Sequence, residues 1–409
     1  MNMKKYKLGD LLFEFHAGKA IQTENIKNKG AYPVYGGNGQ RGYTDSYNQN
    51  GEYLIIGRQG AYCGNVRYNI GKAYLTEHAI VGQAKENHNP IYIALKLSLM
   101  NLSQLQGQSA QPGLSVNTLS CISMEMPPKE IQDKIADIML KLDRKIELNR
   151  QINDNLEAMA KQLYDYWFVQ FDFPNEEGKP YKSNGGVMVW NEDLHMSIPC
   201  TWNTCLLSDY IGSNNTGDWG FDEPAKKRSI KVGCIRGADI VKLNDLPIRY
   251  IKDNNTSKLL SAWDVVIEVS GGGPTQATGR SAFVTPGVLK RNGGNLTCSN
   301  FCHAFTMKDY KASAYFYFMW RMFYDNNNMF NFEGKTSGIK NYMTDTFLAN
   351  KWLDVPTALL DLFFERVKVI YEQIDNNIEE INALTKQRDE LLPLLMNGQA
   401  SINYHLSDD

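Results

Sequence analysis

The sequence predicts an α+β fold in which two long antiparallel coiled-coil helices separate two mixed α/β domains, arranged as an internal repeat. Three observations lead to this prediction. The chain matches itself at two fixed offsets, and each half ends in a long heptad pattern of apolar residues. The middle of each half alternates short apolar runs with glycine-containing turns.

Composition is typical of a globular protein, with 43% hydrophobic and 22% charged residues among 409. No apolar run approaches the roughly 20 residues that span a bilayer, and the N-terminus lacks the apolar stretch of a signal peptide. We therefore expect a cytoplasmic protein without a membrane partner. The seven cysteines are irregularly spaced, and Cys298, Cys302 and His303 do not have zinc-site spacing, so we expect free thiols and no metal.

Residues 1–127 form the first predicted domain, because short apolar runs such as Tyr53–Ile56 read as strands between turns. Residues 128–168 form the first helix, because apolar residues recur there at alternating spacings of four and three. Pro127 and Pro128 stand at its start, where proline is tolerated. About 37 residues at roughly 1.5 Å each predict a rod of about 55 Å.

Residues 169–200 are rich in proline and glycine and are predicted to be a linker. The second domain, at 201–355, has the composition of the first. Residues 356–398 repeat the apolar heptads and end at Gly398, a typical helix stop signal. Residues 399–409 are then a C-terminal tail.

Two offsets define the repeat. At 228 residues, a segment of nearly sixty residues aligns without gaps with the end of the second half. The matched pairs are Ser109 and Ser337, Pro128 and Pro356, Ile146 and Ile374, Asn149 and Asn377, Leu156 and Leu384, and Leu163 and Leu391. A weaker match at 199 residues places Leu8 on Leu207 and Asp10 on Asp209. Each half therefore begins alike and ends alike, and differs in its middle.

Matching seams predict that the two helices pack on each other, although each helix could instead pack on its own domain. Asn149 and Asn377 occupy equivalent seam positions. A buried Asn pair fixes the register of a coiled coil at a cost in stability. Two exposed asparagines on an imperfect apolar stripe are the other interpretation.

No pattern typical of a catalytic site is present. Gly334–Thr336 resembles the end of a phosphate-binding loop, but Met329 stands where the earlier glycine is required. Asn89–Tyr92 lacks the second proline of the motif with which adenine methyltransferases hold a flipped base, and it reads as a turn before a helix. We therefore expect a chain that is not an enzyme by itself.

Motifs along the whole chain resemble the specificity (S) subunit of type I restriction-modification systems. They are Tyr32–Gly39, Gly57–Gly64, Gln108–Leu114, Met126–Gln132, Leu163–Phe168 and Arg388–Gly398. One departure is Pro356, which is followed by Thr357–Leu360 without the Glu-x-Gln-type start of the first helix. The resemblance implies two target recognition domains and two helical spacers with pseudo-twofold symmetry.

The resemblance also implies a non-catalytic subunit of a DNA adenine methyltransferase and restriction endonuclease complex that acts against foreign DNA. Its partners would be double-stranded DNA, two methyltransferase (M) subunits and restriction (R) subunits. S-adenosylmethionine, ATP and Mg²⁺ would belong to those partners, with no cofactor in this chain. Because the domain middles differ, the target would be bipartite and asymmetric. The alternative is a scaffold presenting two protein- or glycan-binding modules, which salt-dependent DNA binding would distinguish.

A net charge of −2 is low for a DNA-binding protein, but a local basic surface is sufficient. Candidates for base contacts are therefore basic and polar residues on loops, each of which could also be an ordinary solvated residue. In the first domain they are Asn38, Gln40, Arg41, Arg58, Gln59, Tyr62, Ser109 and Gln111. In the second they are Lys226, Lys227, Arg228, Arg236, Gln276, Thr278, Arg280, Lys335, Thr336, Ser337 and Lys340.

An aromatic cluster at the end of the first helix is the candidate for binding the M subunit, because interface cores are rich in such residues. It consists of Tyr164, Tyr166, Trp167, Phe168 and Phe171. Packing against the body of a domain is the other interpretation of these side chains.

Overall fold

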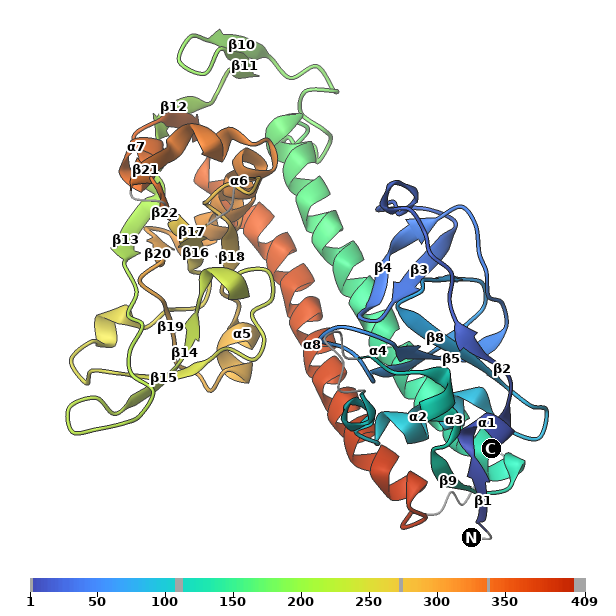
Figure 1. Cartoon of the computed structure of the whole chain (residues 1–409). Coiled ribbons are helices and arrows are strands. Elements are labelled where there is room, and N and C mark those ends of the chain that lie inside the picture. Colours follow the sequence, from blue (N-terminus) through green and yellow to red (C-terminus); the bar gives the residue numbers. More distant parts are fainter. Residues whose placement is uncertain (1–2, 107–112, 272–274, 337–338, 401–409) are drawn as a thin grey trace, which may run out of the picture. The chain divides into compact units, whose positions relative to one another are not determined.

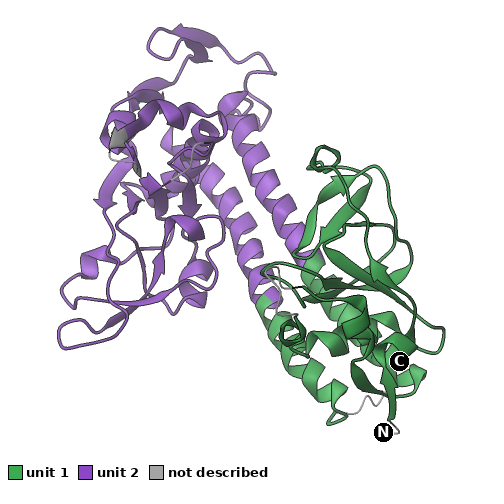
Figure 2. Ribbon diagram, viewed as in Figure 1, with its two compact units in different colours: residues 1–147, 382–409 green, residues 148–381 purple. Residues whose placement is uncertain are grey.

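The computed structural model describes residues 3–106, 113–271, 275–336 and 339–400. It divides into two compact units: unit 1 comprises residues 1–147 and 382–409, and unit 2 comprises residues 148–381 (Figure 2). Within the described ranges, no helix has the length and apolar character needed to cross a bilayer. The predicted domain boundaries stay a prediction, because the compact units cut through both long helices.

Unit 1 contains a four-stranded antiparallel sheet of order β2-β8-β5-β6 and a three-stranded sheet of order β4-β3-β7 (Figure 1). Its strands are β1 (Lys4–Lys7), β2 (Leu12–Ala17), β3 (Tyr32–Gly36), β4 (Gly39–Thr44), β5 (Glu52–Gly57), β6 (Val66–Ile70), β7 (Tyr74–Leu75), β8 (Ala79–Ala84) and β9 (Ser123–Met126). β3 and β7 run parallel, whereas β1 and β9 form a separate antiparallel pair.

The apolar run in β5 is buried on both faces of its sheet. Leu54 and Ile56 belong to one core cluster, and Tyr53 and Ile55 belong to another. Alternate side chains of a strand point to opposite faces, so a strand covered on both sides needs a continuous apolar run. This explains why the sequence between residues 53 and 56 shows no polar alternation.

Three short helices complete unit 1: α1 (Leu8–Leu11), α2 (Pro90–Ser98) and α3 (Val116–Ser120). The Asn89 side chain accepts hydrogen bonds from the backbone N–H groups of Ile91 and Tyr92, at 2.9 and 3.0 Å. Pro90 occupies the first turn, where no N–H donor is needed. The Asn89–Tyr92 segment is therefore a helix start, as the sequence predicts.

Unit 2 repeats the same two sheets, with orders β13-β20-β16-β18 and β15-β14-β19. Its strands are β10 (Met188–Asn191), β11 (Met196–Pro199), β12 (Asn203–Leu206), β13 (Ile211–Asn215), β14 (Ile230–Ile235), β15 (Ile248–Ile251), β16 (Val265–Glu268), β17 (Ser270–Gly271), β18 (Ser281–Phe283), β19 (Leu296–Cys298), β20 (Cys302–Met307), β21 (Glu333–Thr336), β22 (Ile339–Tyr342) and β23 (Lys351–Asp354). Its helices include α5 (Pro286–Arg291), α6 (Ser313–Asp325) and α7 (Thr344–Leu348).

The structure confirms the internal repeat. β12 begins 199 residues after β1, which is the offset found near the start of each half. α7, β23 and the last helix begin 228 residues after α3, β9 and the first long helix. The extra residues of the second half therefore lie between these matching ends.

The two long helices, α4 (Lys129–Tyr164) and α8 (Thr357–Met396), pack on each other in both units (Figure 1). In unit 2, Asn149 donates to Glu380 and Asn377 donates to Asn153, each at 2.7 Å. In unit 1, Arg388 donates to Asp143 at 3.0 Å. Partner numbers fall on α8 as they rise on α4, so the helices are antiparallel. The predicted fold class is confirmed.

Aromatic side chains fill the core of unit 2. Eight consecutive residues at the start of α6 are buried, among them Phe316 and Trp320. The predicted linker contributes to this core, because Phe171 and Phe173 pack against Trp202. Its later part forms the β10–β11 hairpin. The segment between the halves is thus partly folded onto unit 2.

Candidate functional site

Two glycine turns in unit 1 lie against each other. One is Gly36–Gly39 between β3 and β4, and the other is Gly57–Gly60 after β5. A Cβ on Gly57 would lie 2.7 Å from the Gly37 carbonyl oxygen and 2.4 Å from that of Tyr62. Only glycine permits so close an approach of backbones. The turns therefore bring two segments together that are twenty residues apart in sequence.

A third segment joins these turns. Gly113 pairs with Gln59, and the Leu114 N–H donates to the Arg58 carbonyl oxygen at 2.9 Å. Ser109 and Gln111, two of the predicted contact residues, lie outside the described residues. The chain that follows them is nevertheless anchored at the same turn.

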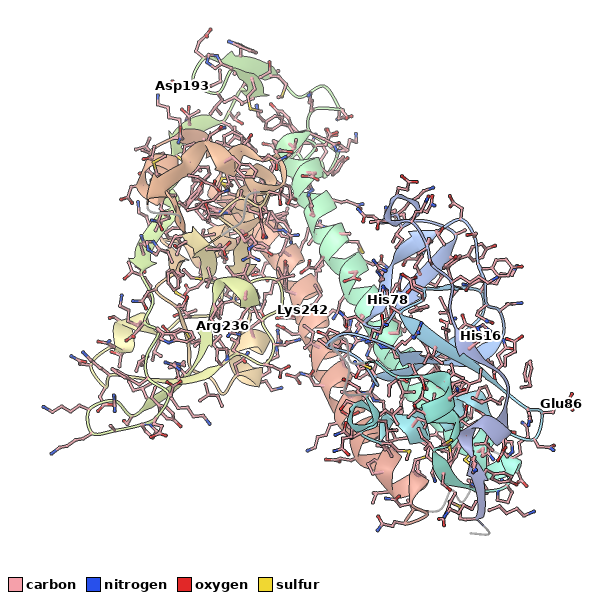
Figure 3. All side chains as sticks on the ribbon, in the orientation of Figure 1. His16, His78, Glu86, Asp193, Arg236 and Lys242 are labelled. Atoms are coloured by element: carbon pink, nitrogen blue, oxygen red, sulfur yellow. The ribbon has the colours of Figure 1, made fainter. Side chains whose placement is uncertain are left out.

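The turns gather the remaining residues predicted for the first domain. Asn38, Gln40 and Arg41 are exposed around the first turn. Around the second, Gln59 and Tyr62 are exposed and Arg58 is half-buried. The Gln59 side chain lies 3.3 Å from Nδ1 of His78, which is labelled in Figure 3. Their contact with DNA stays a prediction.

Arg67 on β6 belongs to the same site, although the sequence did not indicate it. A Cβ on Gly39 would lie 1.8 Å from Nη1 of Arg67, so the guanidinium covers this glycine. Among the residues that the structure describes, Arg41 and Arg67 have no ion-pair partner. Arg67 lies within a strand, whereas the candidates were expected on loops.

Strand pairing defines the equivalent position in unit 2. β5 ends at Gly57 opposite Ala79, and β16 ends at Glu268 opposite Cys302. A Cβ on Gly237 would lie 2.6 Å from Oε1 of Glu268. In unit 1 the backbones at Gly37 and Gly57 come into direct contact at the end of the central strand, and we call this contact the crossing. In unit 2 the Glu268 carboxylate occupies the equivalent place beside Gly237.

Glu268 forms a two-point ion pair with Arg280. Nε and Nη2 of Arg280 donate to the two carboxylate oxygens at 2.8 and 2.7 Å, and the Glu268 side chain is 3% exposed. Arg280 therefore already uses the Nε and Nη2 edge of its guanidinium for this pair. The structure places it as an internal partner of Glu268.

Two further predicted cations of unit 2 are also paired. Nε and Nη2 of Arg236, which is labelled in Figure 3, donate to Asp239 at 2.7 and 2.8 Å. Burial by itself raises the pKa of Asp239, but hydrogen bonds from Arg236 outweigh this effect and leave the pKa lowered. Lys340 forms an ion pair with Glu333 at 2.9 Å.

The prediction for Thr278 is wrong, because this residue is fully buried. Its N–H and Oγ1 donate to Oε1 of Glu333, at 2.8 and 3.2 Å. Gln276 nearby is exposed. Lys335 and Thr336 lie on β21, and Ser337 is outside the described residues.

A basic loop in unit 2 holds three of the predicted residues, Lys226, Lys227 and Arg228. Lys226 and Lys227 are exposed, and together with Lys252 they line a shallow pocket on the surface. The Arg228 guanidinium lies 4.3 Å from the ring centroid of Phe221. Stacking on an aromatic face orients a guanidinium without neutralising its charge. This loop is the most cationic part of the predicted site in unit 2.

The structure contradicts the predicted aromatic partner surface. Tyr164, Trp167, Phe168 and Phe171 are buried in the core of unit 2, and only Tyr166 is exposed. The Phe168 ring centroid lies 4.8 Å from Tyr315 on α6 and 4.9 Å from Phe363 on α8. These rings fill the space between the helix pair and the rest of unit 2. The aromatic residues therefore pack against the body of a domain, which was the alternative interpretation of the sequence.

An exposed apolar stripe runs instead along α4 and the π-helical turn that follows it, Asp165–Val169. Leu148, Ile152, Met159 and Tyr166 are 51%, 37%, 55% and 37% exposed. Their spacings of four, seven and seven residues place them on one helix face. Ile152 and Met159 also have the spacing of four and three residues expected of the helix-pair seam, yet they are exposed, so α4 has apolar residues on two faces. We call these four residues the α4 stripe.

Asn149 and Asn377 are both buried in the helix pair of unit 2, so the interpretation as exposed residues is wrong. They do not bond to each other, because Asn149 donates to Glu380 and Asn377 to Asn153. Each therefore links α4 to α8 by a separate polar contact. Their role in setting the register stays a prediction.

The described part of the chain contains no group of three His, Cys, Asp or Glu residues that could hold a metal ion. Cys298 and Cys302 lie in an apolar core. Burial raises the pKa of Cys302 to about 12, so its thiol is neutral near pH 7.

Residues 1–158 match the family model for the type I restriction modification DNA specificity domain. The chain is 41% identical over 144 residues to the EcoprrI specificity subunit of Escherichia coli, covering 34% of this chain and 36% of that protein. It is 25% identical over 394 residues to the MjaIX specificity subunit of Methanocaldococcus jannaschii, covering 88% and 84%. It is also 32% identical to the N-terminal part of a type I specificity subunit of Mycoplasma pneumoniae, covering 34% of this chain and 77% of that one.

The fold is similar to the crystal structure of a type I restriction-modification S subunit from M. genitalium. The TM-score is 0.60 at 15% sequence identity, and the similarity covers 98% of this chain and 97% of the other. The match thus extends through both halves and both long helices.

Proposed function

The chain belongs to the family of type I restriction-modification specificity subunits, and from this membership we propose that it reads a bipartite, asymmetric DNA sequence. One observation carries the proposal. In unit 1, Arg41, Arg58 and Arg67 lie around the two glycine turns that contact each other. No carboxylate among the described residues forms an ion pair with these three side chains. Such a surface suits contacts to phosphates and base edges.

The two units would read different half-sites. They share strand order and parallel pairing, but unit 1 offers guanidinium groups at its turns and unit 2 offers the basic loop around Lys226 and Arg228. Different side chains on one scaffold recognise different bases, so the complete target is not a palindrome.

The proposal is tested by methylome sequencing of cells that carry this chain with its M subunit, followed by binding of the purified complex to the target found. We expect one interrupted motif with two unlike halves. Affinity for that duplex should fall steeply with salt on a log–log scale, because phosphate contacts release counterions. Salt-independent binding, or equal affinity for any duplex, would reject DNA reading in favour of a scaffold.

We propose further that the α4 stripe binds an M subunit, with one subunit for each half of the repeat. The stripe is apolar and exposed on a helix whose other face is already packed, which is the usual state of an unoccupied interface. Neither the methyl donor nor ATP requires a site in this chain.

Ile152→Asp together with Met159→Asp should abolish co-purification with the M subunit. Val241→Asp is the matched control, because Val241 is also an exposed apolar residue of unit 2, at 73%, but lies outside the stripe. Undiminished co-purification of the stripe variant would exclude this surface. The thermal melting curve of each variant verifies that folding is intact.

We also propose that the helix pair sets the number of unread base pairs between the half-sites. α4 and α8 are each continuous through residues of both units. Removing four residues from α8 should change the spacer length in the methylome and leave both half-sites as they were. An altered half-site with an unaltered spacer would contradict this role.

A further inference from the structure

We propose that Arg67 is a specificity-determining residue of unit 1, and that with Arg41 and Arg58 it selects a half-site containing guanine. This inference rests on the function proposed above and deepens it. It concerns a residue within β6 that was not among the contacts expected from the sequence.

The backbone next to Arg67 is shaped to admit its guanidinium. Gly39 has φ +102°, a conformation that residues with a side chain rarely adopt. A Cβ there would overlap Nη1 of Arg67 at 1.8 Å. Gly39 thus leaves room for the charged group directly at the turn that carries Asn38 and Gln40.

The equivalent residue in unit 2 is apolar. Arg67 pairs with Ile55 across β6 and β5, and Ala282 pairs with Val266 across β18 and β16. These are the same positions, because Gly57 and Glu268 end the two central strands. Ala282 is buried in an apolar core, whereas Arg67 is exposed. At this position the sheet face is therefore covered by apolar residues in unit 2, whereas in unit 1 it carries an exposed cation.

The chemistry of the cluster identifies the base. Arginine donates two parallel hydrogen bonds to O6 and N7 of guanine, which is the commonest specific contact in the major groove. Lysine lacks this planar fork. In unit 2, Arg280 and Arg236 use their Nε and Nη2 edges for ion pairs with Glu268 and Asp239, whereas Arg41 and Arg67 have no carboxylate partner among the described residues. At the equivalent strand ends of the described chain, therefore, the unpaired guanidinium groups belong to unit 1, and guanine selection by these turns is assigned to that unit.

The test uses the complex with its M subunit and the interrupted target found by methylome sequencing. Arg67→Ala should lower affinity for that target by about 5- to 150-fold, since each good two-point contact contributes about 1–3 kcal/mol and 1.4 kcal/mol is tenfold. It should relax specificity at one G·C pair of one half-site. Arg67→Lys should retain binding to random duplex but not restore the lost discrimination.

Gly39→Ala and Gly51→Ala form a matched pair. Both glycines lie in unit 1 with nearly equal φ, +102° and +100°, but a Cβ on Gly51 would meet nothing within 4 Å. Both variants place an alanine at a similar positive φ, and only Gly39→Ala displaces the guanidinium. We expect altered specificity for Gly39→Ala alone.

The possible failures are distinguishable. If the wild-type complex has no interrupted target, the proposed function itself is wrong. If it has one and Arg67→Ala keeps the wild-type preference at every position, or relaxes it only at A·T pairs, the present inference is wrong and the proposed function stands. Equal changes in Gly39→Ala and Gly51→Ala would also overturn it.

Discussion

Gly57 in unit 1 and Glu268 in unit 2 stand at the end of equivalent central strands, where a neighbouring turn crosses. In unit 1 the crossing consists of backbone alone, and the nearby Arg41 and Arg67 have no ion-pair partner in the described ranges. In unit 2 the Glu268 carboxylate fills the crossing and pairs with Arg280. Strand order is the same in both. This scaffold therefore tolerates opposite chemistry at its strand ends, provided that each crossing is closely packed.

The largest effect is expected when the unit 2 pair is broken. Glu268→Ala should destabilise unit 2 by about 3 kcal/mol, because it leaves Arg280 partly buried without its partner. All seven tryptophans lie in unit 2, so urea unfolding followed by tryptophan fluorescence measures this loss. The double variant with Arg280→Ala should be less destabilised than the single one. An unshifted midpoint for Glu268→Ala would show that the pair does not support the crossing.

A smaller loss is expected at the glycine crossing. Gly57→Ala should destabilise unit 1 by about 2 kcal/mol, because the added Cβ meets two backbone oxygens that cannot move independently of their strands. Circular dichroism should report the change, whereas the tryptophan transition should stay in place. Wild-type stability of Gly57→Ala would mean that the turns separate without cost.

Because Arg236 of unit 2 is ion-paired and Arg41 of unit 1 has no ion-pair partner among the described residues, variants of the two units should differ in the salt dependence of DNA binding. Arg41→Ala should reduce the log–log salt slope by about 1, since a cation without a carboxylate partner displaces a counterion from a phosphate. Arg236→Ala should reduce it less, because Asp239 already balances that charge. Equal slopes for both variants would show that the ion pair opens on binding.

The smallest effect concerns two histidines. Burial lowers the pKa of His303 in unit 2, and burial with nearby Lys85 and Lys129 lowers the pKa of His88 in unit 1. A lowered folded-state pKa means that the unfolded chain binds the proton first. Stability is therefore complete above the unfolded value of about 6.5 and falls as the pH drops from there to the folded value.

His303→Leu should make the tryptophan-detected unfolding midpoint less sensitive to pH between about 6.5 and 5. His88→Leu should leave the pH dependence of that transition as in the wild type, because His88 lies in unit 1. A midpoint of His303→Leu that falls with pH as steeply as the wild type would show that this histidine does not contribute.

The long helices and the repeat could be predicted because their signals are local and occur twice. Heptad spacing identified α4 and α8, and the two offsets locate the equivalent elements of the halves. The glycine turns were also identifiable as sites, because each contains glycines within a few residues.

The contacts made by each candidate could not be predicted, because they join residues far apart in sequence. Thr278 binds Glu333, 55 residues later, which makes it a buried structural residue. Phe168 packs on Phe363, so the aromatic residues that were predicted to bind a partner belong to the core of unit 2. Ile152 had the spacing of a seam residue but is exposed.

By itself the sequence determined the class of the molecule: two similar α/β halves, each ending in a long helix. Periodicity and turn residues act through near neighbours, and a single sequence displays them directly. Only the tertiary structure decided which cations are neutralised, which apolar face of α4 is left open, and that Arg67 joins the turns. These outcomes depend on burial and charge pairing across strands, and no local pattern encodes them.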